Sequence, residues 1–224
     1  MLEGHPEMPL ICLFGPDGAG KTSLAKALKV ELARRGFYVQ VHWMRGTHTF
    51  ASLLARMMAK FPSFAGSDNF YYQISIPRRL LHVWQFVEFV SMLPVLLIRF
   101  LLPSLLGIFV IAERYIPDFL VWVTLTTNDS TYFGSFGARF LLSLLSKTRT
   151  KFYVTAEYAE LVRRRNDVAP TFLKGQLDLY DRLAKSVGAS KLDTTWTSAD
   201  ESAKVLIDLV DRDLARRGHP LASD

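Results

Sequence analysis

Cysteine is almost absent from the 224-residue chain, in which Cys12, inside an apolar run, is the only one. A single thiol cannot form an internal disulfide, and no cluster of cysteine and histidine residues has the spacing of a zinc site. The histidines His42, His48 and His82 share no metal-binding spacing either. These absences exclude a disulfide- or zinc-stabilised fold, and we expect a reducing, cytoplasmic compartment.

The chain also lacks an uninterrupted apolar run long enough to span a membrane. Its most apolar stretch, residues 83–112, is interrupted by Glu88 and Arg99. The longest charge-free run, residues 100–112, is shorter than the roughly 20 residues that a spanning helix needs. We therefore expect a buried or dimer-forming helix that leads into a core strand, with contact at a membrane interface as the alternative. No basic start followed by an apolar stretch precedes residue 9, so no signal peptide is expected.

Acidic residues are fewer than basic ones: 21 Asp and Glu against 27 Lys and Arg give a formal net charge of +6. Half of the residues are apolar, which is typical of a globular protein rather than a disordered one. A basic balance suits polyanionic ligands, among them nucleotides, nucleic acids and acidic membranes, and does not choose between them. With no repeat, low-complexity segment or linker, residues 1–224 are expected to form one domain.

Five short segments rich in apolar and β-branched residues predict strands at residues 9–14, 38–43, 108–112, 151–155 and 190–194. Between and after them lie helical patterns at residues 21–35, 51–60, 78–106, 118–126, 136–146, 157–165, 171–186 and from 197 onward. The long helix is expected to break or bend at Pro94 and Pro103, and residues 61–69 are expected to form a loop. This alternation predicts an α/β fold with a five-stranded parallel sheet and helices on both faces.

A glycine-rich loop follows the first predicted strand and precedes the first helix. It fits the pattern G-x-x-x-x-G-K-[ST], in which glycines let backbone N–H groups curl around a phosphate and the helix start adds its positive dipole end. Lys21 is expected to reach the terminal phosphates, and Thr22 to hold the Mg²⁺ that accompanies ATP. The predicted ATP-binding residues are Gly15, Pro16, Asp17, Gly18, Ala19, Gly20, Lys21, Thr22 and Ser23.

A second motif, Glu113-Arg114-Tyr115, closes the third predicted strand. A carboxylate at the end of a core strand is well placed to orient Mg²⁺ or its waters, and an adjacent arginine can clamp a phosphate. Asn128-Asp129 is not the guanine signature of GTPases, and no second apolar strand ends in the Asp-Glu of motor ATPases. The motif therefore favours a kinase over either of those classes.

With these motifs the chain resembles the thymidylate kinase family of nucleoside monophosphate kinases over nearly its whole length. Three segments carry the resemblance: the glycine-rich loop, Glu113-Arg114-Tyr115 at the family's Asp-Arg-Tyr, and Arg163-Arg164-Arg165-Asn166-Asp167 at its basic lid. The sequence departs from the family in the Glu that replaces Asp, and in Arg45-Gly46-Thr47-His48, where the family has Arg-Glu-Pro-Gly-Gly. The apolar middle region, where the family reads thymine, matches poorly.

The resemblance implies a P-loop nucleoside triphosphate hydrolase fold with a lid at about residues 163–172. It further implies that Asp17 contacts the acceptor sugar, that Arg45 and Arg114 hold the acceptor phosphate, and that Thr22 and Glu113 manage the metal. Because the glycine-rich loop contains no arginine, the lid is expected to supply cations to the transferring phosphate. The implied catalytic residues are Lys21, Glu113, Arg114, Arg163, Arg164 and Arg165.

Other residues have two interpretations from sequence alone. The aromatic side chains Phe70, Tyr71, Tyr72 and Trp84 are either core residues or stacking partners for a base. Asp118 either caps the helix that begins near it or supports the site.

The expected function is transfer of the ATP γ-phosphate to dTMP to give dTDP, with Mg²⁺ bound with ATP. The expected partners are ATP, a nucleoside monophosphate and a second copy of the chain, with no nucleic acid. One alternative keeps the fold and changes the acceptor to another nucleotide, a deoxynucleoside or a sugar-type hydroxyl. The other is an ATP-binding module docked on a membrane or partner through residues 83–106.

Overall fold

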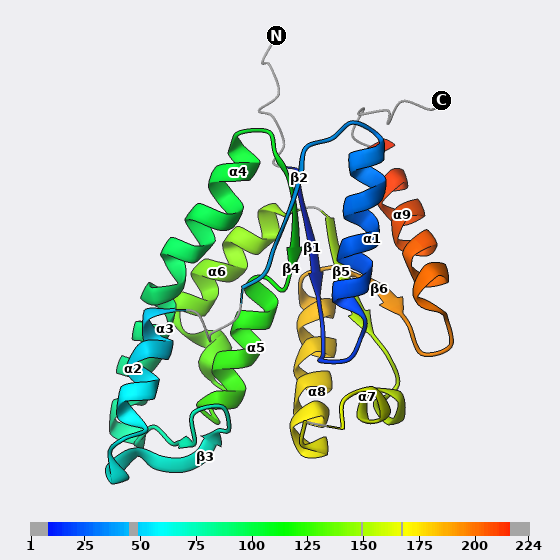
Figure 1. Ribbon diagram of the computed structural model, residues 1–224. Helices are drawn as coiled ribbons and strands as arrows, with labels where there is room; N and C mark the ends of the chain where they lie inside the picture. The colour runs from blue at the N-terminus through cyan, green and yellow to red at the C-terminus, as the bar shows by residue number, and fades with distance from the viewer. Residues whose placement is uncertain (1–8, 45–48, 149, 167, 216–224) are drawn as a thin grey trace.

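A parallel sheet of five strands, in the order β2-β4-β1-β5-β6, runs through the centre of the molecule (Figure 1). A computed structural model describes residues 9–44, 49–148, 150–166 and 168–215. The strands are β1 (Leu10–Phe14), β2 (Val39–His42), β4 (Phe109–Glu113), β5 (Thr150–Thr155) and β6 (Ser190–Asp193). The predicted α/β class and all five predicted strands are thereby confirmed.

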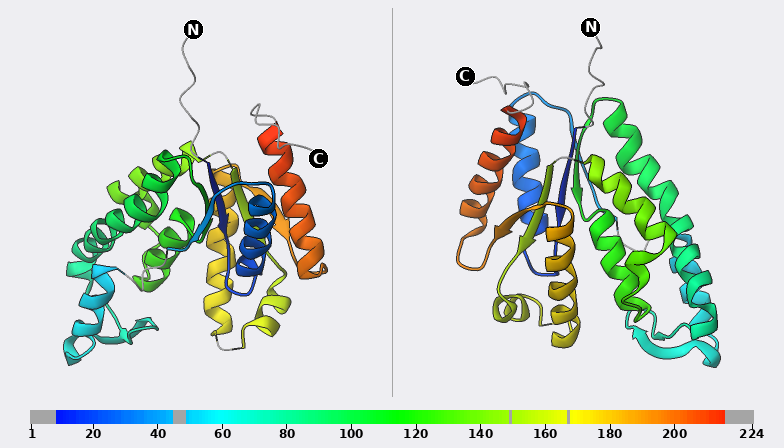
Figure 2. Two further views of the ribbon diagram at one scale, coloured as in Figure 1. Left: turned by 45° about the horizontal axis from the view of Figure 1, so that its top comes forward. Right: turned by 180° about the vertical axis from the view of Figure 1, so that it is seen from behind.

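Helices cover both faces of the sheet (Figures 1 and 2). Alternate side chains of β1 divide between the faces, with Leu10, Cys12 and Phe14 on one and Ile11 and Leu13 on the other. The helices packed on the Ile11 face are α1 (Lys21–Arg34), α7 (Tyr158–Arg164) and α9 (Ala199–Ala215). Those on the Cys12 face are α3 (Leu81–Leu96), α5 (Ile116–Thr126), α6 (Phe136–Lys147) and α8 (Pro170–Ser186). Burial on both faces explains why the central strands are apolar throughout.

The carboxyl ends of the strands meet at one edge of the sheet. Leu13 pairs with Glu113 across β1 and β4, and Phe14 pairs with Tyr153 across β1 and β5. The glycine-rich loop therefore leaves β1 beside the last residue of β4. In open parallel sheets this edge is the usual place for a ligand site.

The segment between α2 (Phe50–Met58) and α3 differs from the expected loop. It contains a 3₁₀ turn, Pro62–Phe64, and an extended strand, β3 (Ala65–Asn69), which lies outside the main sheet and bridges to Ile74. The side-chain Oδ1 of Asn69 accepts the backbone N–H groups of Tyr71 (3.1 Å) and Tyr72 (3.3 Å). The aromatic run that starts at Phe70 therefore lies in a side-chain-capped turn and not in a helix.

The long middle helix is continuous through the two prolines at which a break or bend was predicted, so the helix does not break there. The 3₁₀ turn Arg78–Leu80, helix α3, a π-helical turn Leu97–Leu101 and α4 (Leu102–Leu105) follow one another without interruption. Pro94 lies inside α3, shortly before the π turn begins, and such turns are local departures from α-helical geometry. Pro103 is the second residue of α4 and directly follows that turn.

The same helix is far more exposed than predicted. Its 28 residues, Arg78–Leu105, are long and apolar enough to cross a membrane by length and composition, but only 28% of its most apolar window is buried. The expectation of a buried helix is wrong, because the body of the protein covers one side of the helix only, whereas the expectation of a dimer-forming helix stays a prediction. Among the described residues, it is the one helix of this length and hydropathy.

Candidate functional site

The glycine-rich loop has a backbone that only glycine accommodates at its key positions. Gly15, Gly18 and Gly20 have φ angles of 146°, 89° and 88°, in the region that side chains with a Cβ avoid. A Cβ on Gly15 would stand 1.9 Å from the carbonyl oxygen of Val154 in β5. Gly20 is the N-cap of α1 and offers no side-chain cap, so the first amides of α1 are open to an external acceptor.

Lys21 lies buried at the start of α1 and folds back into the loop. Its Nζ donates to the carbonyl oxygens of Gly15 and Pro16, each at 2.6 Å. Burial, and then the nearby Arg114 guanidinium, lower the pKa of Lys21 to about 7. An ammonium group desolvated in this way gains strongly from an anion placed beside it.

Thr22 and Glu113 meet at the edge of the sheet. The Thr22 hydroxyl donates to the Glu113 carboxylate, which joins the first turn of α1 to the end of β4. A hydroxyl and a carboxylate oxygen in contact are the hard donors that Mg²⁺ prefers, so these two residues fit the predicted metal site when phosphates and waters complete it. The described residues contain no group of three or more His, Cys, Asp or Glu side chains able to hold a metal ion alone.

Arg114 and Asp17 form a buried ion pair beside the glycine-rich loop. The Asp17 backbone N–H and carboxylate are both bonded to the Gln176 amide of α8, at 3.0 and 3.3 Å. Burial acts to lower the pKa of Arg114, but the carboxylates of Asp17 and Asp118 outweigh it and raise that pKa. A permanent cation is thereby fixed next to the loop.

The Arg114 backbone is itself in an unusual conformation. Its φ of 76° is left-handed, which costs a residue with a Cβ about 1–2 kcal/mol. Its N–H donates to Leu13 (3.0 Å) and its carbonyl accepts from Met44 (3.1 Å), so strands on either side hold this conformation in place. Backbone strain of this kind is concentrated at functional sites, where a side chain is held in one orientation.

Asp118 both caps α5 and lies beside Arg114, which are the two roles that the sequence left open. Its carboxylate accepts the Tyr115 backbone N–H at 3.0 Å, which caps α5. It also accepts the Tyr180 hydroxyl at 2.9 Å and lies 3.7 Å from Arg114. Burial raises the pKa of Asp118, against the lowering effects of Lys21 and Arg114.

The three arginines of the predicted lid have different surroundings. The Arg163 guanidinium is 75% exposed and paired with Glu160. Arg164 donates to the Gly18 carbonyl (3.3 Å) and to the Thr194 carbonyl (2.8 Å). The Arg165 chain packs on the loop, since a Cβ on Gly18 would stand 2.9 Å from its Cγ. Two of the three therefore touch the glycine-rich loop.

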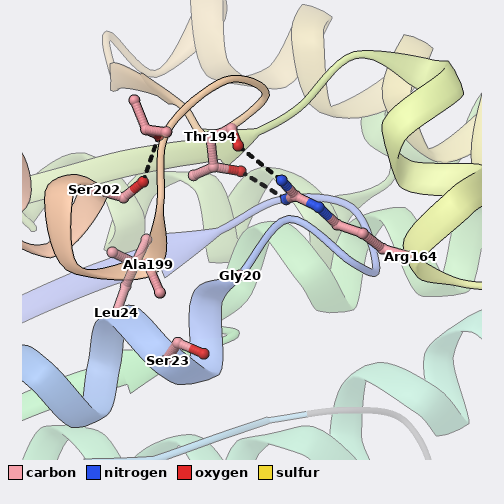
Figure 3. A pocket seen from close by; sticks show the side chains of 8 residues that line it. Gly20, Ser23, Leu24, Arg164, Thr194, Ala199 and Ser202 are labelled. Carbon is pink, nitrogen blue, oxygen red and sulfur yellow. Dashed lines mark hydrogen bonds between the residues drawn. The ribbon is translucent and has the colours of Figure 1, made fainter.

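A cavity of about 250 Å³ opens between the start of α1, the Arg164 guanidinium and the β6–α9 connection (Figure 3). Thr194 links two walls of this cavity, because its hydroxyl accepts a hydrogen bond from Arg164 (3.1 Å) and donates one to the Ala19 carbonyl (3.1 Å). The lining residues are Gly20, Ser23, Leu24, Arg164, Thr194, Thr197, Ala199 and Ser202. The cavity thus begins where the glycine-rich loop ends.

On the other side of Arg114 the molecule is nearly closed by aromatic rings. Phe70 packs on Phe172 and Trp122 at ring-centroid distances of 4.5 and 6.3 Å, and Tyr71 packs on Trp122 at 5.3 Å. A cavity of only about 10 Å³ remains between Arg114 and this aromatic cluster. The turn that carries Phe70 therefore lies over the Arg114 side of the site.

No protein-family model matches the chain, and no curated protein gives a significant match. The assignment of the site therefore depends on the residues that the fold brings together.

Most of the predicted site residues converge on one edge of the sheet. The loop residues Gly15 to Ser23, the pair Glu113 and Arg114, and Arg164 and Arg165 lie together, whereas Arg163 is exposed and paired with Glu160. Arg45 and Asp167 lie outside the described residues.

Sequence reasoning missed Gln176, Tyr180 and Thr194. Gln176 and Tyr180 share the buried stripe of α8 with Leu173, and a polar side chain on such a stripe is the available signal. Thr194 directly follows the short strand β6, at the carboxyl edge of the sheet, and this position alone would have indicated a site residue.

Proposed function

We propose that the chain is a P-loop kinase that transfers the γ-phosphate of ATP to a nucleoside monophosphate, with dTMP as the first acceptor to test. The observation that carries the proposal is the convergence of a glycine-rich loop, a buried lysine, a hydroxyl–carboxylate pair and a buried Arg114–Asp17 pair. Phosphoryl transfer needs little covalent chemistry from a protein, and these groups supply what it does need, positioning and neutralisation of charge.

The donor side is assigned to the loop and the adjoining cavity. The open amides at the start of α1 and the Lys21 ammonium would take the β- and γ-phosphates, with Lys21 exchanging its two loop carbonyls for phosphate oxygens. The cavity of about 250 Å³ beside Arg164 would receive the nucleoside part of the donor. Bound through Thr22 and Glu113, Mg²⁺ would supply neutralisation of the phosphate charge.

The acceptor side is assigned to Arg114, Asp17 and the aromatic cluster. Arg114 carries a fixed positive charge for the acceptor phosphate, and Asp17 offers an acceptor for a sugar hydroxyl. Phe70, Tyr71, Trp122 and Phe172 offer rings on which a base stacks. The remaining space of about 10 Å³ cannot hold a base, so the rings that line it, Trp122 and Phe172, would have to shift when the acceptor enters.

In the reaction, an oxygen of the acceptor phosphate attacks the γ-phosphorus while the bond to the β–γ bridging oxygen breaks. The products are ADP and the nucleoside diphosphate, and no protein nucleophile is needed. Arg164 and Arg165, carried by a segment that covers the loop, would neutralise charge on the transferring group and keep water away.

The decisive experiment is an ADP-release assay with ATP, Mg²⁺ and a panel of acceptors: dTMP, dUMP, dCMP, dGMP and dAMP. We expect an acceptor-dependent rate with at least one, and loss of ATP binding in Lys21→Ala. Rates that no monophosphate increases, with ATP binding intact, would remove the monophosphate kinase assignment and favour a nucleoside or sugar acceptor. Unchanged ATP binding in Lys21→Ala would remove the loop assignment as well.

A further inference from the structure

The exposed side of the long middle helix is a continuous apolar surface. Val83, Phe86 and Val90 are 61%, 61% and 44% exposed, and Ile98 and Leu105 are 63% and 65% exposed. These positions recur every three or four residues or in multiples of that spacing, which places them on one side of a helix. The further exposed members of this stripe are Leu80, Leu97, Leu102 and Leu106.

The surface extends from this helix onto α6. Phe89 lies between the two, with ring centroids 6.4 Å from Phe86, 6.5 Å from Phe136 and 5.9 Å from Phe140. Phe136 and Phe140 are themselves 78% and 41% exposed. We call the stripe of the middle helix together with Phe136 and Phe140 the apolar face.

Helices α3 and α4, which carry most of the apolar face, lie on the side of the molecule opposite α1 and α9 (Figures 1 and 2). At 1.5 Å per residue, the 28 residues of Arg78–Leu105 make a helix about 40 Å long. Soluble monomers rarely leave an apolar surface of this length uncovered, so it marks an interaction site. The opposite side of the helix is packed on the protein core through Met92, Leu96 and Phe100, which excludes insertion across a bilayer.

The exposed charges on the helices around the apolar face are of one sign, although Asp129, which accepts a hydrogen bond from Gln85 of α3, lies beside them. Helices α2, α3, α4 and α6 carry no exposed carboxylate along their lengths, and their single acid, Glu88, is buried. The exposed cations on these helices and on the turn that precedes α3 are Arg56, Arg78, Arg79, Arg99, Arg139 and Lys147. Whatever covers this surface must be apolar at its centre and negatively charged at its rim.

A second copy of the chain would supply the apolar centre but not the negatively charged rim. A two-fold interface places the same surface on both partners. These helices would then bring cations from both copies to the interface and no exposed carboxylate to pair with them. An acidic phospholipid surface meets both requirements, because its acyl region is apolar and its headgroups are anionic.

We propose that the apolar face docks the protein on an anionic phospholipid bilayer, with the helix Arg78–Leu105 lying in the plane of the interface. The apolar side chains enter the boundary between headgroups and acyl chains, and the arginines pair with the lipid phosphates. This inference does not depend on the proposed kinase activity, and either can fail without the other.

Vesicle co-sedimentation of the full chain tests the docking, with phosphatidylcholine vesicles compared with vesicles that contain phosphatidylglycerol. We expect binding to the anionic vesicles, at least tenfold weaker binding to the neutral ones, and release at high salt because salt screens the arginines. Arg78→Gln/Arg79→Gln is expected to weaken binding by about fivefold for each arginine near the surface.

A matched pair of double variants tests whether vesicle binding depends on the apolar face or on exposed valines in general. Val83→Ser/Val90→Ser alters the face, whereas Val30→Ser/Val205→Ser alters valines 69% and 45% exposed on α1 and α9. We expect at least tenfold weaker vesicle binding for the first and a change of less than twofold for the second, with equal far-UV circular dichroism.

Three outcomes would overturn the proposal. They are no sedimentation with anionic vesicles, an equal loss of binding in both double variants, or a stable dimer by light scattering that only Val83→Ser/Val90→Ser converts to a monomer. The third would show that a second copy covers the surface.

Discussion

Gly15 lies where the backbone of the glycine-rich loop passes closest to β5. Gly15→Ala would place a methyl group 1.9 Å from the Val154 carbonyl oxygen, and we expect it to destabilise the protein by at least about 3 kcal/mol. Gly20→Ala is the control, because Gly20 also has a positive φ, 88° against 146° for Gly15, but no atom within 4 Å of its added methyl group. It should cost about 1–2 kcal/mol.

Denaturant unfolding of the two glycine variants measures the difference. Equal losses of stability would mean that the contact with β5 does not fix the loop.

Lys21 gives the site a proton-linked signature. Without an anion, burial holds its pKa at about 7, so at pH 8 the side chain is mostly neutral. A triphosphate beside it favours the ammonium form, and ATP binding at pH 8 should take up close to one proton. Titration calorimetry in buffers of different ionisation enthalpy counts that proton.

Lys21→Arg is the control for proton uptake, because arginine is charged at every pH used. Uptake that persists in this variant would assign the proton to another group.

Glu88 is buried with no hydrogen-bond partner for its Oε2 among the described residues. Burial raises the pKa of Glu88 from 4.5 to about 8. The folded protein therefore retains this proton between about pH 4.5 and 8 while the unfolded chain releases it, and stability falls as pH rises through that window. Glu88→Gln stays neutral and should remove this loss.

We expect Glu88→Gln to be more stable than the parent by on the order of 3 kcal/mol at pH 8. The gain should shrink towards zero near pH 4.5. Urea unfolding across this range checks the slope, and a difference between the two proteins that does not vary with pH would contradict it.

Among the elements, the end of α7 carries the clearest functional contrast. Arg164 contacts Gly18 and Thr194, whereas Arg163 is exposed and paired with Glu160. We expect Arg164→Ala to lower kcat by about 100-fold, because it removes a cation from the transferring phosphate. Arg163→Ala should change kcat by less than threefold, and steady-state kinetics of both variants compare the two. Equal effects would assign the role to the helix end as a whole.

The continuity of the middle helix could not be predicted from the sequence. Pro94 and Pro103 correctly signal local departures from α-helical geometry, but packing of Met92, Leu96 and Phe100 keeps the helix continuous. The short turn at Asn69 could not be predicted either, because side-chain hydrogen bonds stabilise it and the periodicity of the sequence does not reveal them. Tertiary contacts decided the first case, and a local side-chain cap decided the second.

For the whole molecule, the alternation of apolar strands with helices was sufficient to predict the five-stranded parallel sheet. The sequence assigned Thr22 and Glu113 to one metal site, which requires the two to meet, and they do so because β1 and β4 are neighbours in the sheet. Gln176 and Thr194 come from segments more than 150 residues away from the loop that they contact. Such partners depend on how helices pack, which the periodicity of one sequence does not determine.

Transfer of radiolabel from γ-labelled ATP to dTMP, resolved by thin-layer chromatography, tests the central claim most directly. With Mg²⁺ present, the proposed function predicts label in dTDP that depends on both the enzyme and dTMP, and that disappears in Lys21→Ala. Label found only in inorganic phosphate, or left entirely in ATP with dTMP and every other monophosphate of the panel, would contradict it.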